Sequence, residues 1–252
     1  MSPATPVEVC IAAAAEAWRG DGEILATGIG LLPRIAASLA RSTFSPDLLL
    51  TDGEALLLAE PMPLGNPAKK RIEGVMNYRL VFDMLWAGRR HIMMGASQID
   101  RFGNTNISCI GDWSRPGAQL IGVRGAPGNS INHPCSFWIP NHSRRVFVEQ
   151  VDMASGVGYD DRRWPEGAWR AFQEIRRVVT NLCVMDFKGR DHAPRLCSVH
   201  PGIAIDQVRE STGFDLEVPA NVPETRLPTD EELRLIRQVL DPSNRREQER
   251  LG

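Results

Sequence analysis

The pattern of apolar and polar residues along the chain predicts strands that alternate with helices. Short apolar or alternating runs, which suit buried strands, lie at 23–27, 47–51, 92–94, 106–111, 119–123, 144–151, 178–187 and 196–199. Apolar residues recur at helical spacing at 7–18, 34–41, 78–87 and 205–212. This alternation predicts an α/β fold with an open, mostly parallel sheet and helices on both faces.

Two features in the C-terminal part of the chain refine this prediction. Thr229 precedes three acidic residues and then an apolar stripe, which is typical of a capped helix start. Residues 243–252 are rich in charge and are predicted to form a frayed tail. No stretch has the composition of a linker, so residues 1–252 are predicted to form a single domain.

Composition and charge argue against several classes of protein. The chain has 252 residues, of which 42% are apolar and 24% charged, and this is ordinary globular composition. The formal net charge of -2 gives no reason to expect a nucleic-acid partner. No apolar run approaches the length that crosses a bilayer, and no basic segment precedes an apolar one near the N-terminus. We therefore expect neither a membrane anchor nor a signal peptide.

The cysteines give a further indication of the compartment. There are five, widely spaced and without a C-x-x-C pair. Reduced thiols in a cytoplasmic protein are therefore expected. A metal site is not expected, because no two cysteines have the spacing of zinc ligands.

A polar, glycine-rich stretch at 95–106 follows the apolar run at 92–94. It contains four side chains that are able to bind a ligand: Gln98, Arg101, Asn104 and Asn106. At the end of a buried strand, such a segment would face the crevice in which open α/β sheets bind ligands. A sharp strand–loop–strand corner, closed by Asx turns of Asp100 and the asparagines, explains the same residues. On the stretch alone, the corner is the favoured interpretation.

Two further segments also follow predicted strands. Asp52 and Glu54 come after the strand at 47–51, where a carboxylate is well placed for acid–base chemistry, although a solvated turn explains them too. A glycine-rich loop at 124–130 follows the strand at 119–123. The loop offers a cation, flexible backbone and an amide: Arg124, Gly125, Gly128 and Asn129.

The order of these motifs resembles that of a known family. A Gly28-Ile29-Gly30 turn, the acid at 52, the stretch 95–106 and the loop at 124–130 are followed by Val178-Val179-Thr180-Asn181-Leu182 and Thr212-Gly213-Phe214. This order is similar to that of the β subunits of class I coenzyme A transferases, particularly the glutaconate type. The resemblance covers residues 7–242, and its most specific part is 95–104.

The resemblance also exposes two departures. In the family, a glutamate at the end of an early strand attacks the acyl-CoA thioester while backbone N–H groups bind the oxyanion. The matching residue here is Asp52, which is one methylene shorter. Pro127 lies in the loop that should supply N–H donors, and proline has none. Both departures argue against a covalent transferase cycle.

One branch of the superfamily is a closer match. The chain resembles the β subunit of the actinobacterial cholesterol ring-cleaving hydrolase. The resemblance implies hydrolytic, retro-Claisen opening of a cyclohexenone-carboxyl-CoA ring, with the catalytic glutamate on an α subunit and an α2β2 assembly. Coenzyme A would then enter as part of the substrate, and no separate cofactor is expected.

The resemblance assigns expected roles to the candidate residues. Asp52 and Glu54 would support a base on the partner chain, and Gln98, Asn104 and Asn106 would donate hydrogen bonds to the substrate. Two arginines would meet a carboxylate or phosphate of the substrate, and the rest of the 124–130 loop would form a wall: Arg101, Arg124, Gly125, Gly128 and Asn129. Pairing within a subunit interface explains Arg101 equally well. Two alternatives stay open: a transferase subunit that uses Asp52 or Glu54, and a non-catalytic scaffold for an α subunit.

Overall fold

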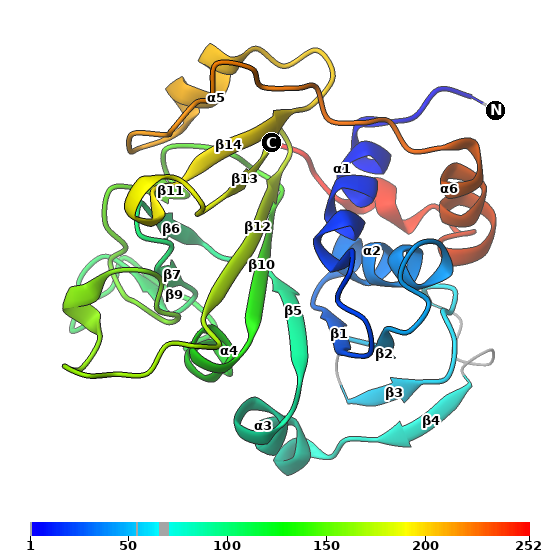
Figure 1. Cartoon of the computed structure of the whole chain (residues 1–252), viewed down its shortest axis with the longest axis horizontal. Coiled ribbons are helices and arrows are strands. Elements are labelled where there is room, and N and C mark those ends of the chain that lie inside the picture. Colours follow the sequence, from blue (N-terminus) through cyan, green and yellow to red (C-terminus); the bar gives the residue numbers. More distant parts are fainter. Residues whose placement is uncertain (1, 54, 66–70) are drawn as a thin grey trace.

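A computed structural model describes residues 2–53, 55–65 and 71–252. Within these residues a nine-stranded sheet forms the centre of the molecule, in the order β14-β13-β12-β10-β5-β1-β2-β3-β4 (Figure 1). The five central strands are mutually parallel: β12 (Glu174–Thr180), β10 (Pro134–Ile139), β5 (Arg90–Met94), β1 (Leu25–Gly28) and β2 (Leu49–Thr51). Antiparallel strands extend both edges: β13 (Cys183–Asp186), β14 (Arg195–Val199), β3 (Leu56–Leu58) and β4 (Ile72–Val75).

One face of the sheet is covered by helices from both ends of the chain (Figure 1). These are α1 (Pro6–Ala15), the 3-10 turn η1 (Glu16–Trp18), α2 (Leu31–Ser42), α6 (Asp230–Arg234) and the π-helical turn η5 (Leu235–Leu240). Met93, Trp138 and Val179 project from the central strands into this layer. The capping box predicted at Thr229 is present, because Thr229 accepts from the backbone N–H of Glu232 and the Glu232 side chain accepts in return.

The opposite face carries a more varied layer. It contains α5 (Ile205–Ser211) and a small sheet of β11 (Phe147–Val148), β6 (Gln98–Asp100) and β7 (Thr105–Asn106), while α3 (Tyr78–Ala87) packs against α4 (Ala126–Asn132). Ile92, Phe137 and Val178 project into a second core with Val208 of α5. The predicted α/β class is therefore confirmed. The remaining helical turns in the described residues are η3 (Asp161–Arg163), η4 (Arg190–His192) and η6 (Arg245–Gln248).

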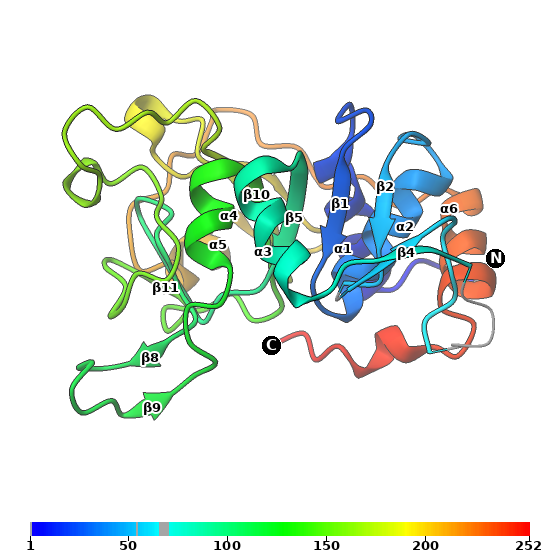
Figure 2. The ribbon, with the colours of Figure 1, turned by 90° about the horizontal axis from the view of Figure 1, so that it is seen from below.

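A short hairpin projects from the second layer as an arm (Figure 2). It consists of β8 (Cys109–Ile110) and β9 (Ala118–Gln119), which pair in antiparallel register. Its base is held by Asp152, which accepts a hydrogen bond from the backbone N–H of Gly111 at 2.9 Å. None of the helices in the described part of the chain is long and apolar enough to cross a membrane.

Several element predictions need correction. The predicted strand at 106–111 is broken, because the Asn106 side chain accepts from the backbone N–H of Ser108 and turns the chain. The strands predicted at 119–123 and 144–151 shrink to Ala118–Gln119 and Phe147–Val148. The glycine-rich loop at 124–130 is largely helix α4. The apolar run 178–187, which suits a buried strand pair or one long strand, is confirmed as the antiparallel pair β12 and β13.

The C-terminal segment packs onto the molecule, so its predicted fraying is wrong. Arg246 is 6% exposed and forms ion pairs with Glu8 at 3.2 Å and with Asp241 at 3.0 Å. The Trp138 indole donates to the Glu249 carboxylate at 2.7 Å. Burial alone would raise the pKa of Glu8, but hydrogen bonds from Arg237 and Thr5 hold it below its usual value. The charge of the tail thus neutralises a buried carboxylate, and this role cannot be read from local composition.

Candidate functional site

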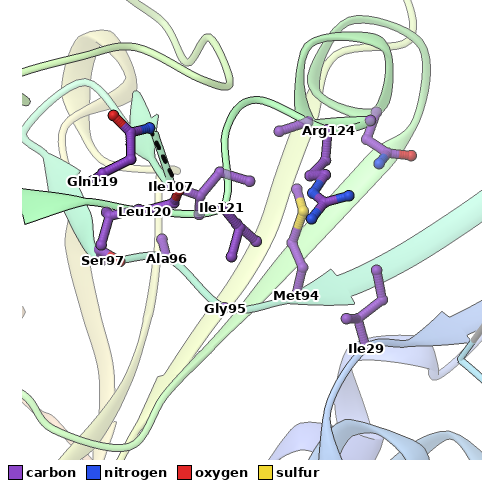
Figure 3. Close-up of a pocket in the computed structure, with 13 residues that line it drawn as sticks. Ile29, Met94, Gly95, Ala96, Ser97, Ile107, Gln119, Leu120, Ile121 and Arg124 are labelled. Atoms are coloured by element: carbon purple, nitrogen blue, oxygen red, sulfur yellow. Dashed lines mark hydrogen bonds between the residues drawn. The ribbon is translucent and has the colours of Figure 1, made fainter. Parts of the chain in front are cut away.

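A cavity of about 760 Å³ opens where β1 and β5 end, between the base of the arm and the start of α4 (Figure 3). Its lining is mainly apolar, with five large side chains: Ile29, Met94, Ile107, Leu120 and Ile121. Ile29 is 43% exposed and Ile121 is 64% exposed. Exposed apolar side chains that converge on one cavity are typical of a binding site.

The parallel sheet explains the position of the cavity. Ile29 follows β1, and its backbone N–H donates to the carbonyl of Met93 on β5 at 2.8 Å. The chain then leaves β5 through Gly95, Ala96 and Ser97, which line the cavity. Both strands point their carboxyl ends at the same edge, and this is the edge at which open α/β sheets bind ligands.

Arg124 supplies the charge of the cavity. Its guanidinium lies beside Met94 in Figure 3. It is the charged side chain among the described residues that line the cavity. Its backbone has φ 50°, a left-handed conformation that costs a non-glycine residue about 1 kcal/mol. A cation held in an apolar cavity favours a ligand with an anionic or strongly polar oxygen.

The other predicted substrate-binding residues of the 124–130 segment lie partly at the cavity and partly in the interior. Gly125 and Asn129 line the cavity. Gly128 packs against α3, where an added Cβ would lie 3.2 Å from Cβ of Leu85. Pro127 occupies the first turn of α4, where its missing N–H costs no helical hydrogen bond.

The three predicted polar donors of the 95–106 stretch form the framework behind the cavity. Gln98, Asn104 and Asn106 are 5%, 0% and 0% exposed. The Asn106 amide donates to Oε1 of Gln98 at 2.8 Å and to the Cys109 carbonyl at 2.7 Å. The Asn104 amide donates to Asp100 at 3.0 Å. These side chains bond to the protein itself, so the structure does not bring them to the cavity.

Asp100 organises this framework. Its carboxylate accepts from the backbone N–H groups of Phe102 and Asn104, both at 3.0 Å, and of Val151 at 3.4 Å. Burial raises the pKa of Asp100, and hydrogen bonds from Asn104 oppose that shift. The corner interpretation of this stretch is therefore confirmed for 98–106, while residues 95–97 alone reach the cavity.

Arg101 and Asp52 also lie away from the cavity. Arg101 is on the surface and pairs with Glu149 at 2.7 Å. Asp52 closes the turn between β2 and β3, where its Oδ1 accepts from the backbone N–H of Leu56 at 3.1 Å. It lines a separate cavity of about 200 Å³. The other predicted carboxylate, Glu54, lies outside the described residues.

The cysteines and other potential metal ligands do not assemble. In the part of the chain that the structure describes, no group of three His, Cys, Asp or Glu side chains could hold a metal ion. Burial raises the pKa of Cys135 and of Cys183 to about 12, so both are thiols at neutral pH. The groups that the cavity offers for chemistry are therefore the cation of Arg124 and the amide of Asn129, in apolar surroundings.

Comparison with known proteins identifies the family. Residues 11–211 match the family model described as coenzyme A transferase. The chain belongs to this family. The cholesterol ring-cleaving hydrolase IpdB subunit of Rhodococcus jostii (strain RHA1) is 52% identical over 245 residues, which are 97% of this chain and 96% of that protein. A 3-oxoadipate CoA-transferase chain of Pseudomonas knackmussii is 33% identical, and the match covers 94% of each chain.

Solved structures agree with this family assignment. The crystal structure of Rhodococcus jostii RHA1 IpdAB matches with a TM-score of 0.92 at 51% identity and covers 98% of each chain. The decarboxylase AibA/AibB matches with a TM-score of 0.81 at 25% identity, covering 98% of this chain and 99% of that one. The resemblance predicted from the order of motifs is confirmed.

The sequence prediction missed the apolar part of the site. Met94 ends the predicted strand at 92–94 and Ile29 lies two residues after the predicted strand at 23–27, so closeness to a strand end was the available signal. Leu120 and Ile121 looked like a buried strand, because an apolar run does not reveal whether it covers a core or a cavity. Arg90 carried another signal, because this charged residue lies two positions before the apolar run at 92–94.

Proposed function

We propose that this chain is the β subunit of a heteromeric hydrolase that opens a cyclohexenone-carboxyl-CoA ring from steroid degradation. The ring opens by hydrolytic, retro-Claisen C–C cleavage, and coenzyme A enters as part of the substrate. The IpdB subunit, at 52% identity over nearly the whole chain, supports this assignment. The proposed partner is an α subunit, in line with the two-component IpdAB structure, and we extend this to an α2β2 assembly in the cytoplasm.

One observation carries the proposal: the 760 Å³ cavity is apolar, and its charged lining residue is an arginine. Such a cavity suits a hydrocarbon ring that bears carbonyl oxygens. Hydrolysis also needs a base to activate water. Among the described residues that line the cavity none has a carboxylate. The resemblance to the ring-cleaving hydrolases implies that a glutamate of the α subunit is this base, and we adopt that assignment.

The transferase alternative requires an acidic nucleophile on this chain. The Asp52 carboxylate accepts a hydrogen bond from its own turn and lies at the smaller cavity. The turn nevertheless adjoins the end of β1, because a Cβ on Gly53 would lie 2.6 Å from the carbonyl of Gly28. The two hypotheses therefore need a chemical test.

The test is an assay of the purified αβ complex with the ring CoA ester and no acceptor acid. The hydrolase should release a ring-opened CoA product that takes up one oxygen atom from ¹⁸O-labelled water. Turnover that requires an added carboxylate would instead establish a transferase. Asp52→Asn should lower ring opening less than about threefold, since it leaves the base in place, whereas it should abolish a covalent transferase cycle.

A further inference from the structure

Arg90 is a buried cation that has no carboxylate partner among the described residues. It begins β5 and is 6% exposed. Its Nε donates to the Thr27 hydroxyl at 3.1 Å, and its Nη1 donates to Oδ1 of Asn129 at 3.4 Å. Burial lowers the pKa of Arg90 to about 10, so the side chain is still charged at neutral pH. Burying a charge that is bonded only to neutral groups lowers the stability of the fold, so a functional role for Arg90 is worth seeking.

The hydrogen bond from Arg90 fixes the orientation of the Asn129 amide. A guanidinium group only donates, so the Asn129 atom that faces it has to be the oxygen. The amide nitrogen then lies on the other branch of the side chain, near Gly125. A Cβ built on Gly125 would lie 3.4 Å from this nitrogen. Gly125 and Asn129, which is 4% exposed, both line the large cavity, so these N–H groups lie at its wall.

We propose that Asn129 donates a hydrogen bond to the substrate carbonyl oxygen that gains negative charge as the C–C bond breaks, and that Arg90 is the positioning residue that holds the amide in this orientation. The identity of the acyl group rests on the proposed function. Arg124 faces the same cavity, so two donors of different character meet the ligand there.

The chemistry explains why a fixed donor is useful. In a retro-Claisen cleavage, water adds its hydroxyl to the acyl carbon while the C–C bond breaks. The bonding electron pair moves onto the neighbouring carbonyl group, whose oxygen becomes negative. The proton from water finally joins the released carbon, so no further reactant is needed. A donor that is already oriented toward the oxygen stabilises the transition state without reorganisation.

Asn129→Asp is the sharpest test, because it separates stability from activity. The new carboxylate would pair with buried Arg90, so the Tm of the αβ complex should rise. The same change removes the N–H donor and places negative charge near the reacting oxygen, so kcat/KM for ring opening should fall by about 10²- to 10³-fold. Activity within threefold of wild type would overturn the proposal.

Asn132→Asp is a matched control on the same helix. The Asn132 amide donates to the Leu85 carbonyl at 2.8 Å, and Asn132 does not line the large cavity. This variant should lower the Tm through repulsion from that carbonyl while kcat/KM stays within threefold of wild type. A loss of activity equal to that of Asn129→Asp would mean that any charge on α4 inactivates the complex, and the proposal would fail.

The role of Arg90 is tested by two replacements. Arg90→Lys keeps a donor toward Oδ1 of Asn129, whereas Arg90→Gln can face that amide in either orientation. We expect kcat to fall about tenfold more in Arg90→Gln than in Arg90→Lys, with KM nearly unchanged. Equal kcat values in two complexes of equal Tm would show that Arg90 does not orient the amide.

A binding measurement separates this proposal from the proposed function. Acetoacetyl-CoA serves as the probe, because it presents carbonyl oxygens without a ring, and calorimetry gives its Kd for each complex. If wild-type complex fails to open the ring, the proposed function falls. The Asn129 assignment would still stand if Asn129→Asp raised this Kd at least tenfold, and an unchanged Kd would sink it.

Discussion

Two polar segments of similar composition have opposite roles in this molecule. The β6/β7 corner at 98–106 and the segment at 124–129 each combine one arginine with glycine and amide side chains. In the corner, Asp100, Asn104 and Asn106 are buried, and their hydrogen bonds run to the protein itself. In the second segment, Arg124 adopts a left-handed backbone conformation and faces an apolar cavity.

The difference teaches that composition does not distinguish a scaffold from a ligand-binding surface. What distinguishes them is where the hydrogen bonds go. A polar side chain whose donors and acceptors are already satisfied has nothing to offer a ligand, and breaking its bonds costs stability. A cation in an apolar cavity is the reverse case, because its interactions are completed by what binds.

The largest expected effect comes from exchanging Arg124. Arg124→Met in the αβ complex should lower kcat/KM for ring opening by about 10²- to 10³-fold, because the cavity loses its polarising donor. The Tm should not fall. Arg101→Met is the matched control: it removes a surface ion pair with Glu149 and should change kcat/KM less than threefold. If both variants lost activity to the same degree, the functional contrast between the two segments would disappear.

A smaller effect, on stability alone, is expected in the 98–106 corner. Asp100→Asn replaces one acceptor oxygen by a donor, so buried N–H groups of the corner lose a partner. The complex should be destabilised by about 2 kcal/mol, measured as the free energy of unfolding in urea. Activity per folded complex should stay close to that of wild type. If the Asp100→Asn complex were stable but had an impaired kcat, Asp100 would belong to the functional site and not to the framework behind it.

The smallest expected effect is a pH dependence of stability, and it arises in the layer that contains the 98–106 corner. His142 is stacked on Phe147 of β11, which pairs with β6, and its ring nitrogens lie 3.1 Å and 2.9 Å from the hydroxyls of Thr180 and Thr212. Burial lowers the pKa of His142 to about 3, below its usual value of 6.5. The unfolded chain therefore takes up the proton first as the pH falls.

The stabilisation from neutral His142 is complete above pH 6.5 and is lost as the pH falls toward 3. At pH 5.5 the loss should be about 1.4 kcal/mol. Urea unfolding of wild type and His142→Gln at pH 7.5 and 5.5 measures it, and the variant should show a flatter dependence. Parallel profiles would mean that other buried histidines, such as His91 and His200, account for the acid sensitivity.

Much of the fold was predictable because its signals are local. The helix at 78–87 has the predicted bounds, and the cap at Thr229 lies where the pattern placed it. The central strand β10 was not predicted. Its apolar run Phe137, Trp138 and Ile139 has no alternation, and His133 and Pro134 precede it. Its strand character comes from pairing with β5 and β12, which are distant in sequence.

The site was predictable only in part, because some of its contacts join residues that are distant in sequence. Arg124, Gly125 and Asn129 were identified by residue type and do line the cavity. The roles expected of Gln98, Asn104 and Asn106 depended on where their side chains point, and a tight corner turned them inward. The link between Arg90 and Asn129 spans 39 residues and has no local pattern.

The ion pair between Glu8 and Arg246 has a consequence for how the chain is made. Its two members are separated by 238 residues, yet Glu8 belongs to the first helix. A carboxylate that is buried without its partners is strongly unfavourable. We therefore expect α1 to reach its final environment on the sheet only after Arg237 and Arg246 have been synthesised. On this face, the environment of the first helix is completed by residues near the end of the chain.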